Sequence, residues 1–229
     1  MKNISIGILF AFLLTTVGCQ MNESPDPNEP IVEPRFAILV ESDTIRAGSY
    51  LGLNVSEKSE TIYSNIQSLR VPEKISYVNV VSNNTSDVTQ LRNRIPLYQS
   101  ILLDQKAGTD SGVQITIEEG KVKSIFLNSG KKLTQWPEKS DTKSSVRVGD
   151  QAGELYQKMI NIYNKGTYAN KFERITLTTK DMSTGFDSVM TQSPQWYFSY
   201  STGQDQWEMV QLHLKNGKVD YMVVNRFKY

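Results

Sequence analysis

Few side chains in this sequence could carry out covalent chemistry. The chain has one histidine, His213, and one cysteine, Cys19. A serine nucleophile needs a nearby base, and His213 is the only histidine that could supply it. The sequence holds no Gly-x-Ser-x-Gly turn, no His-x-x-x-His pair and no glycine-rich phosphate loop. It therefore predicts a protein without enzymatic activity and without a cofactor or metal site.

Paired carboxylates offer a second route to catalysis. Glu118 and Glu119 are adjacent in a predicted turn, where two acids are usually solvated. Asp104 and Asp110 could line a calcium loop, but their spacing differs from that of an EF-hand. A hydrolase that uses an acid pair remains an alternative, although no particular pair is indicated.

The cysteine follows an apolar leader. Residues 4–17 are too short a run to span a bilayer comfortably and are typical of a secretory signal peptide. The residues Thr16-Val17-Gly18-Cys19 resemble the bacterial lipobox. That resemblance implies a lipoprotein in which Cys19 is acylated and becomes the N-terminus. A chance cysteine in the leader of a soluble secreted protein is the alternative.

The segment after Cys19 is expected to act as a tether. Residues 20–35 hold four prolines and four acids and little that could be buried. Beyond Lys2 in the leader, the chain has 24 basic and 24 acidic residues, so we expect no nucleic-acid partner. We expect a membrane partner through the Cys19 anchor, in the bacterial cell envelope. The outer membrane or cell surface is favoured over the inner membrane.

One pattern occurs twice in the chain. VQITIEEGKVKSIFLN at 113–128 returns as VQLHLKNGKVDYMVVN at 210–225, a constant 97 residues later. Each copy follows a predicted helix with one apolar stripe. The stripe residues are Ile62, Ile66 and Leu69 in the first helix and Leu155, Met159 and Ile162 in the second. The sequence thus predicts an α+β fold with a tandem duplication of a helix and about four antiparallel strands, over residues 36–137 and 138–229.

This pattern resembles the β-lactamase-inhibitor-protein architecture and the small outer-membrane-assembly lipoproteins. The comparison rests on Ile45-Arg46-Ala47-Gly48, on Val146-Arg147-Val148-Gly149 and on the Gly-Lys-Val hairpins. The inhibitor family uses disulfides within each repeat, and this chain has none. The resemblance implies a non-enzymatic binding or assembly module with an envelope or secreted protein partner. An inhibitor or immunity-type lipoprotein that blocks an enzyme or toxin is the alternative.

The last hairpin suggests where binding would occur. Asn216-Gly217 is a strong two-residue turn signal. A regular hairpin around that turn places His213 opposite Asp220 and gives the sheet an outward face of mixed aromatic, methionine and polar residues. The side chains of Trp196, Phe198 and Tyr200 join this face or the core, depending on the length of the following loop. The predicted binding face comprises Trp207, Met209, Gln211, His213, Asp220 and Met222, with Gln114 and Ile125 in the first copy.

Overall fold

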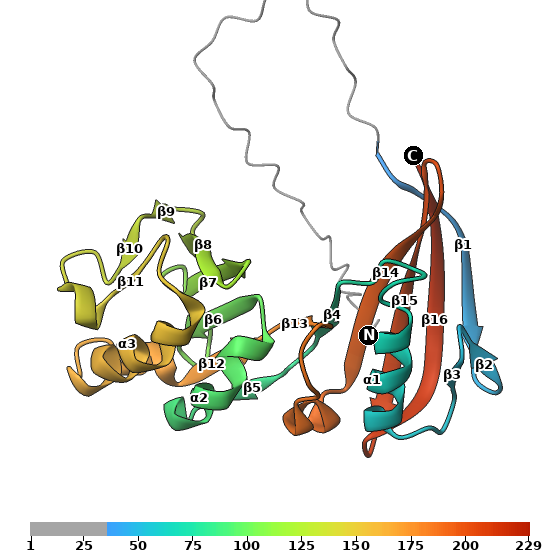
Figure 1. The fold of residues 1–229 in the computed structure, drawn as a ribbon, viewed down its shortest axis with the longest axis horizontal. Coiled ribbons are helices and arrows are strands. Elements are labelled where there is room, and N and C mark those ends of the chain that lie inside the picture. The colour runs from blue at the N-terminus through green and yellow to red at the C-terminus, as the bar shows by residue number, and fades with distance from the viewer. Residues whose placement is uncertain (1–35) are drawn as a thin grey trace, which may run out of the picture. The chain divides into compact units, whose positions relative to one another are not determined.

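Two six-stranded antiparallel sheets form the framework of the protein (Figure 1). The structure is a computed structural model and describes residues 36–229, which form one compact unit. The predicted signal peptide, the Cys19 lipidation site and the 20–35 tether lie outside the described residues. Helices and antiparallel strands are both present, which confirms the predicted α+β class.

The two sheets are named here sheet 1 and sheet 2. Sheet 1 has the strand order β5 (Asn84–Thr85), β12 (Arg174–Leu177), β6 (Ser100–Asp104), β7 (Val113–Glu118), β8 (Lys121–Leu127) and β9 (Lys132–Leu133). Sheet 2 has the order β1 (Ile38–Ile45), β16 (Lys218–Lys228), β15 (Gln206–Lys215), β14 (Gln195–Gly203), β4 (Tyr77–Val80) and β13 (Thr179–Asp181). Two short ribbons pair β2 (Ser49–Tyr50) with β3 (Leu53–Asn54) and β10 (Gln135–Trp136) with β11 (Val146–Arg147).

The helices bury the predicted apolar stripes except for Leu69, which is only partly buried and lies at the C-cap that follows the first helix. The helices are α1 (Ser59–Ser68), the single turn α2 (Leu91–Arg94) and α3 (Ala152–Asn164). α1 buries Ile62 and Ile66, and α3 buries Leu155, Met159 and Ile162. These side chains share one core cluster with the inward side chains of both sheets. Burial of such stripes, rather than helix propensity, stabilises helices of this length.

The two ends of α3 are formed differently. Gly166 follows the helix at φ +78°, where glycine meets little steric penalty. At the other end, Gln151 occupies the N-cap without a side-chain hydrogen bond, although the aspartate before it, Asp150, is a residue type that often caps helices. Asp150 instead accepts a hydrogen bond from the Arg147 amide at 2.7 Å and forms an ion pair with Lys158 at 2.6 Å.

The two quoted hairpins are β7–β8 in sheet 1 and β15–β16 in sheet 2, and they pair in the same register. Both turns have two successive residues at positive φ, as a type I′ turn requires. The values are 50° and 74° at Glu119 and Gly120, and 53° and 68° at Asn216 and Gly217. Positions 97 residues apart have equivalent partners: Val113 pairs with Leu127 and Ile115 with Ile125, as Val210 pairs with Val224 and Leu212 with Met222.

Each hairpin also contains a register shift at the equivalent place. In sheet 1 the shift lies between Thr116 and Ile117, and in sheet 2 it lies between His213 and Leu214. One residue on the partner strand is left without an opposite residue, as in a β-bulge. In sheet 2 that residue is Asp220, because Tyr221 pairs with His213 and Val219 pairs with Leu214. Every pair beyond the bulge is therefore displaced by one residue from a regular hairpin.

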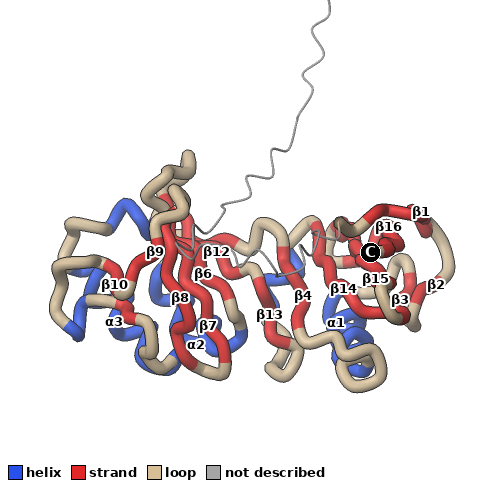
Figure 2. The backbone as a smooth tube through the Cα atoms, turned by 90° about the horizontal axis from the view of Figure 1, so that it is seen from above, coloured by secondary structure: helices blue, strands red, loops and turns tan. Residues whose placement is uncertain are grey.

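Two chain segments cross between the sheets. The segment 77–85 supplies β4 to sheet 2 and then β5 to sheet 1, whereas 174–181 supplies β12 to sheet 1 and then β13 to sheet 2. Backbone hydrogen bonds join the segments where they pass, from Val80 N to Thr178 O at 2.8 Å and from Leu177 N to Asn83 O at 3.1 Å. Figure 2 shows β13 and β4 between the other strands of the two sheets. Residues 36–137 and 138–229 therefore each contribute strands to both sheets.

Candidate functional site

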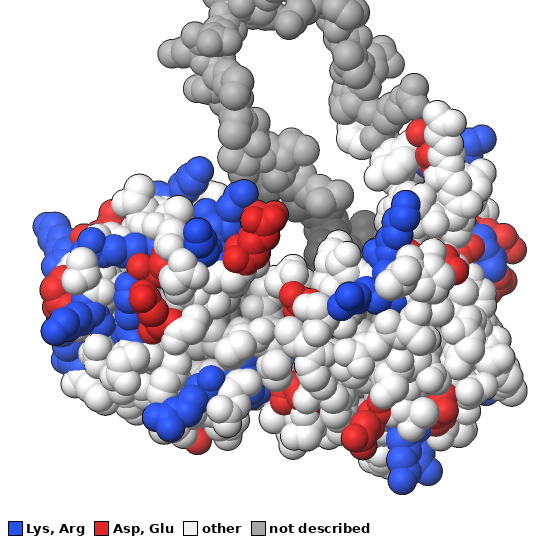
Figure 3. Space-filling model, viewed as in Figure 1, with Lys and Arg blue, Asp and Glu red and all other residues white. Residues whose placement is uncertain are grey.

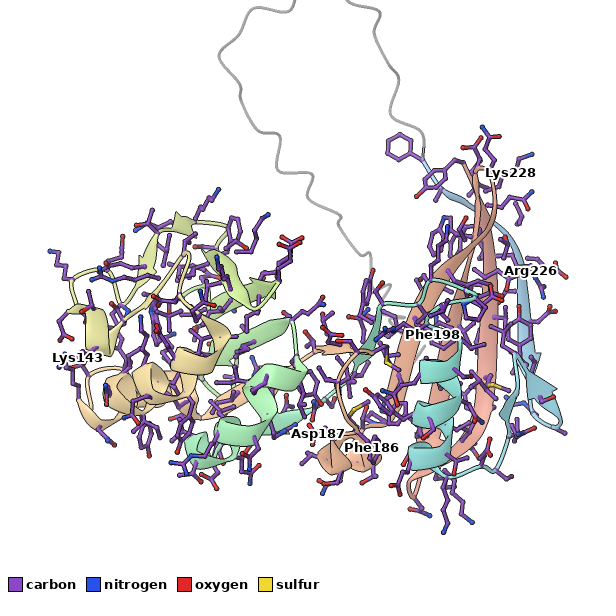
Figure 4. All side chains as sticks on the ribbon, viewed as in Figure 1. Lys143, Phe186, Asp187, Phe198, Arg226 and Lys228 are labelled. Carbon is purple, nitrogen blue, oxygen red and sulfur yellow. The ribbon has the colours of Figure 1, made fainter. Side chains whose placement is uncertain are left out.

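Sheet 2 has one buried face and one partly exposed face. On the buried face, Trp196 and Phe198 of β14 and Val210 and Leu212 of β15 have no solvent exposure. Phe198 lies on the same side of the sheet as α1 (Figure 4). The opposite side, which we name the outer face, carries the alternate residues of the two long strands. Its partly exposed members are Trp207, Met209, Gln211 and His213 on β15 and Tyr221, Val223, Asn225 and Phe227 on β16.

An aromatic stack lies at each end of the outer face. The rings of Trp207 and Phe227 are parallel within 7°, with centroids 4.1 Å apart. The rings of His213 and Tyr221 are parallel within 8°, with centroids 4.2 Å apart. The Arg46 guanidinium lies 4.9 Å from the Tyr221 ring centroid, a cation–π geometry. Because stacking fixes the rings, they present apolar area with little conformational entropy left to lose on binding.

Amides and a thioether lie between the two stacks. Gln195 Nε2 donates to Gln211 Oε1 at 3.2 Å, and Gln211 Nε2 lies 3.7 Å from the sulfur of Met209. Ser42 on the neighbouring strand donates to Asn225 at 2.7 Å. Aromatic and methionine side chains beside polar groups are the composition enriched at protein–protein interfaces. Four of the predicted residues, Trp207, Met209, Gln211 and His213, therefore lie together on one face.

Met222 and Ile125 do not belong to the predicted binding face. Both are completely buried, and they occupy equivalent positions in the two hairpins, Met222 opposite Leu212 and Ile125 opposite Ile115. The regular hairpin assumed from the sequence placed them outward. The bulge shifts the register by one residue, which moves a side chain to the other face of the sheet.

The predicted pair of His213 and Asp220 is also wrong. Tyr221 lies opposite His213, and Asp220 is the exposed, unpaired residue of the bulge. Partial burial lowers the pKa of the His213 imidazole from its usual value, and the Asp220 carboxylate opposes that shift only in part. The imidazole is therefore neutral at neutral pH and suited to stacking, with no carboxylate opposite it to orient it as a base.

Gln114 lies on sheet 1, away from the outer face of sheet 2. It is exposed, pairs with Phe126 and donates to Asn128 Oδ1 at 2.9 Å. Its other neighbours on that side of the sheet are Thr116 and Ser124 and, on β6, Ser100 and the partly exposed Leu102. The outward side of sheet 1 is thus mainly polar and has no counterpart of the stacked aromatic pairs.

Of the aromatic residues of β14, Trp196 and Phe198 belong to the core, whereas Tyr197 is partly exposed opposite Gln211. Trp196 and Phe198 are fully buried, and the Trp196 indole nitrogen donates to Met190 O at 3.3 Å. Tyr200 points to the same side but lies near the end of the strand, where its hydroxyl meets a polar cluster. The alternative in which these rings join the binding face is therefore excluded by their burial.

The polar cluster beyond the core centres on Glu208. Tyr200 and Tyr50 both donate hydroxyl hydrogen bonds to Glu208 Oε2, the former at 2.6 Å, and Arg226 Nε donates to Oε1 at 3.0 Å. Burial alone would raise the Glu208 pKa, but these donors outweigh it and hold the pKa below its usual value. Arg226 also joins Asp43 at 2.5 Å, which connects β16 to β1 (Figure 4). The Glu208 carboxylate is therefore ionised, and its hydrogen bonds to residues of neighbouring strands stabilise the packing of those strands.

A second polar cluster, which the sequence did not reveal, lies buried beside the crossing segments. Arg94 Nε and Asp187 Oδ2 are 2.9 Å apart, and both side chains are almost fully buried. Tyr98 donates to the same oxygen at 2.7 Å, and Asn83 accepts from Arg94 Nη2 at 2.5 Å. These residues come from four separate places in the sequence with no recognisable spacing, so only the tertiary structure brings them together.

Lys180 extends the buried cluster on the second crossing segment. Its ammonium donates to Asp181 O at 3.0 Å and to Thr184 Oγ1, and it faces the Tyr63 ring at 5.1 Å. Burial lowers the Lys180 pKa to about 8, although Asp181 and Asp187 act in the opposite direction. The residue has no solvent exposure, so this amine is a structural group rather than an accessible nucleophile.

The acids of the sequence do not form a metal site in the described part of the chain. Asp104 is buried and accepts from the Gln105 amide, from both the amide and the hydroxyl of Thr109 and from Asn128 Nδ2, at 2.7–3.0 Å. Its oxygens are therefore occupied by donors rather than free for calcium. Within residues 36–229, no three His, Cys, Asp or Glu side chains are placed to hold a metal ion.

A surface depression of about 550 Å³ lies at the end of sheet 1. Trp136, Pro137 and Tyr168 form its apolar wall, and Lys171 lies at its polar side. The Lys171 ammonium is held by the hydroxyls of Thr109 and Ser111 at 2.8 and 2.6 Å. A depression of this volume would suit a small ligand. The Lys171 ammonium, however, already donates its hydrogen bonds to the 105–112 loop.

Comparisons of the chain with protein-family models, with curated protein sequences and with solved structures found no match. Between residues 36 and 229, no helix has the length and apolar character needed to cross a membrane. Positive and negative side chains are interspersed on the face shown in Figure 3.

Proposed function

We propose that this protein is a lipid-anchored component of the bacterial envelope that binds another protein through the outer face of sheet 2, without catalysing a reaction. The observation that carries the proposal is the pair of fixed aromatic stacks with methionine and amide side chains between them. Such a face combines rigid apolar area with hydrogen-bonding groups, which is typical of binding surfaces. The outward side of sheet 1 offers no equivalent, so binding is assigned to sheet 2.

We also infer that the two halves arose by tandem duplication. The equal registers of the two hairpins, their matching bulges and their matching turns support this inference. The crossing segments add a further correspondence, because Val80 and Leu177, 97 residues apart, lie in equivalent strands. Divergence of the outward residues then left stacked aromatic rings on one sheet and polar residues on the other.

The binding proposal is tested with a matched pair of variants. Val223 in sheet 2 and Phe126 in sheet 1 are equivalent, partly exposed positions, opposite Gln211 and Gln114 respectively. Val223→Lys places a charge in the middle of the outer face and should weaken partner capture from envelope extract about tenfold or more. Phe126→Lys should change capture less than about twofold.

Equal losses for the two variants would remove the assignment to sheet 2. The inhibitor or immunity alternative differs in its partner rather than in its face. A parallel capture from a mixture of secreted hydrolases and toxins separates the two, because only an inhibitor would retain an enzyme and reduce its activity.

Lipid anchoring is tested at Cys19. The motivation is the Thr16-Val17-Gly18-Cys19 motif behind an apolar run. In bacteria that express the chain, labelled palmitate should enter the wild type and should be absent from the Cys19→Ser variant. Equal labelling of both proteins would exclude this cysteine as the anchor.

A further inference from the structure

The two six-stranded sheets have four edges, and one of them differs from the rest. Three edge strands are very short: β5 and β9 have two residues each and β13 has three. The fourth, β1, has eight residues and pairs only with β16. A long edge strand presents a row of backbone groups to which another strand can pair, and most proteins shorten or charge such edges. β1 is therefore the edge best suited to strand addition.

The first half of β1 and the residues before it are apolar and exposed. The exposed fraction is 74% at Phe36, 65% at Ile38, 52% at Leu39 and 60% at Val40. Tyr229, also more than half exposed, follows Lys228, which pairs with Ile38. Five of the nine large hydrophobic residues that are exposed in the described chain thus gather at this corner. Exposed apolar patches of this kind mark interaction sites.

The second half of β1 is protected by charge. Glu41 and Asp43 lie there, and Arg226 holds them at 3.0 and 2.5 Å. The uncharged part is thus confined to residues 36–40, and it ends at a bulge, because Val40 has no partner on β16. The occupant must supply backbone groups as well as apolar side chains, because lipid alone would leave the edge amides and carbonyls without partners.

We propose that β1 pairs antiparallel with β1 of a second copy of this chain, across a two-fold axis near Leu39. A two-fold axis brings the same patch of both copies together, so the two apolar halves cover each other. With the axis at Leu39, Ile38 of each copy lies beside Val40 of the other, and the extra residue at the Val40 bulge ends the regular pairing there, before Glu41. An axis at Glu41 would place two glutamates directly opposite each other, which is unfavourable.

The pairing joins two copies of sheet 2 into one continuous sheet. Leu39 pairs with Phe227, and Phe227 stacks on Trp207, so the edge is continuous with the outer face. The dimer therefore presents two outer faces side by side. The contact between the two β1 strands is smaller than the interface of a typical stable dimer. The lipid anchor proposed above compensates for this, because anchoring both copies in one membrane raises their effective concentration.

The test uses the chain with Cys19→Ser, which removes the only thiol. We expect light scattering at concentrations on the order of 100 µM to show dimers. Val40→Lys should weaken self-association about tenfold or more, because Val40 is the unpaired residue at the β1 register shift and a lysine protects the edge. Val71→Lys, at a residue that is 79% exposed and far from β1 in sequence, is the matched control and should leave the dimer unchanged.

Single cysteines then report the register. In this thiol-free background, Leu39→Cys should oxidise to a disulfide-linked dimer, because the two copies of residue 39 lie opposite each other. Asp43→Cys should stay monomeric under the same oxidation. The proposal is overturned by a wild type that is monomeric at these concentrations, by equal effects of Val40→Lys and Val71→Lys, or by equal crosslinking at positions 39 and 43. Val40-dependent binding of monomers to phosphatidylethanolamine–phosphatidylglycerol vesicles would also overturn it and assign the patch to lipid.

Discussion

Met222→Lys should destabilise the protein by about 5 kcal/mol, enough to unfold a typical domain of marginal stability. Met222 is completely buried opposite Leu212 within the core cluster. A lysine there would place an ammonium among apolar side chains without a partner, and the protein would have to neutralise or expose it. Urea unfolding followed by circular dichroism should show a midpoint far below that of the wild type.

The neighbouring residue provides the control. Val223 lies on the same strand with its side chain on the outer face, where it is partly exposed. Val223→Lys should cost about 1 kcal/mol or less. If Val223→Lys were the more damaging of the two, the bulge would be misplaced and the two faces of sheet 2 would have to be exchanged.

Asp187→Ala should cost about 3–5 kcal/mol, because it leaves the buried Arg94 guanidinium without its counter-ion. Asp187 lies between the two sheets (Figure 4), and its carboxylate contacts the Arg94 guanidinium and the Tyr98 hydroxyl. Arg94 Nη1 already has no hydrogen-bond partner within the described residues, so the variant cannot redistribute its bonds easily. Thermal unfolding should show a large drop in melting temperature.

Asp87→Ala is the matched comparison for that variant. Asp87 and Asp187 both begin a short 3-10 helix and accept a backbone amide, from Thr89 and Val189 at 2.9 and 3.1 Å. Asp87 is exposed and forms no ion pair within the described chain, so its loss removes only a helix cap and should lower the melting temperature much less than Asp187→Ala does. Similar losses from both variants would show that the Arg94 contact adds little to stability.

Local patterns in the sequence predicted the elements well. The helical stripes, the paired strands after each helix and the Asn216-Gly217 turn are all present at the expected positions. Each of these features depends on residues close together in sequence. The burial of Val78 and Val80 in β4, and of their counterparts Ile175 and Leu177 in β12, follows from the alternation of buried and exposed residues along a strand.

The bulge could not be predicted from the sequence. A bulge at Asp220 changes which residues face outward, yet aspartate beside a turn is equally compatible with a regular hairpin. The bulge at Asp220 moved Met222 from the predicted binding face into the core and placed Tyr221 opposite His213. The equivalent bulge at Lys123 in sheet 1 moved Ile125 into the core. The residues predicted for the binding face on β15 therefore lie on the outer face, whereas the prediction for Met222 on β16 was wrong.

The crossing of the two segments between the sheets could not be predicted from local sequence patterns either. Alternation shows that the strands at 77–80 and 174–177 have a buried face, but it does not show which sheet they join. The buried cluster of Arg94, Asp187 and Lys180 depends on this crossing, which explains why no spacing in the sequence indicated it. Buried charges beside the two crossing segments are suited to favouring this arrangement of the strands over other arrangements.

The assignment of binding to the outer face of sheet 2 is tested most directly by photocrosslinking in intact cells. A benzophenone side chain is introduced at position 223 in one variant and at the equivalent position 126 in the other. Both positions are partly exposed and each lies on the strand next to an edge strand of its sheet, so the probe occupies equivalent surroundings in the two variants. We predict a light-dependent adduct with another protein at position 223 and none at position 126. An adduct at position 126 alone, or adducts of equal intensity at both positions, would contradict the assignment.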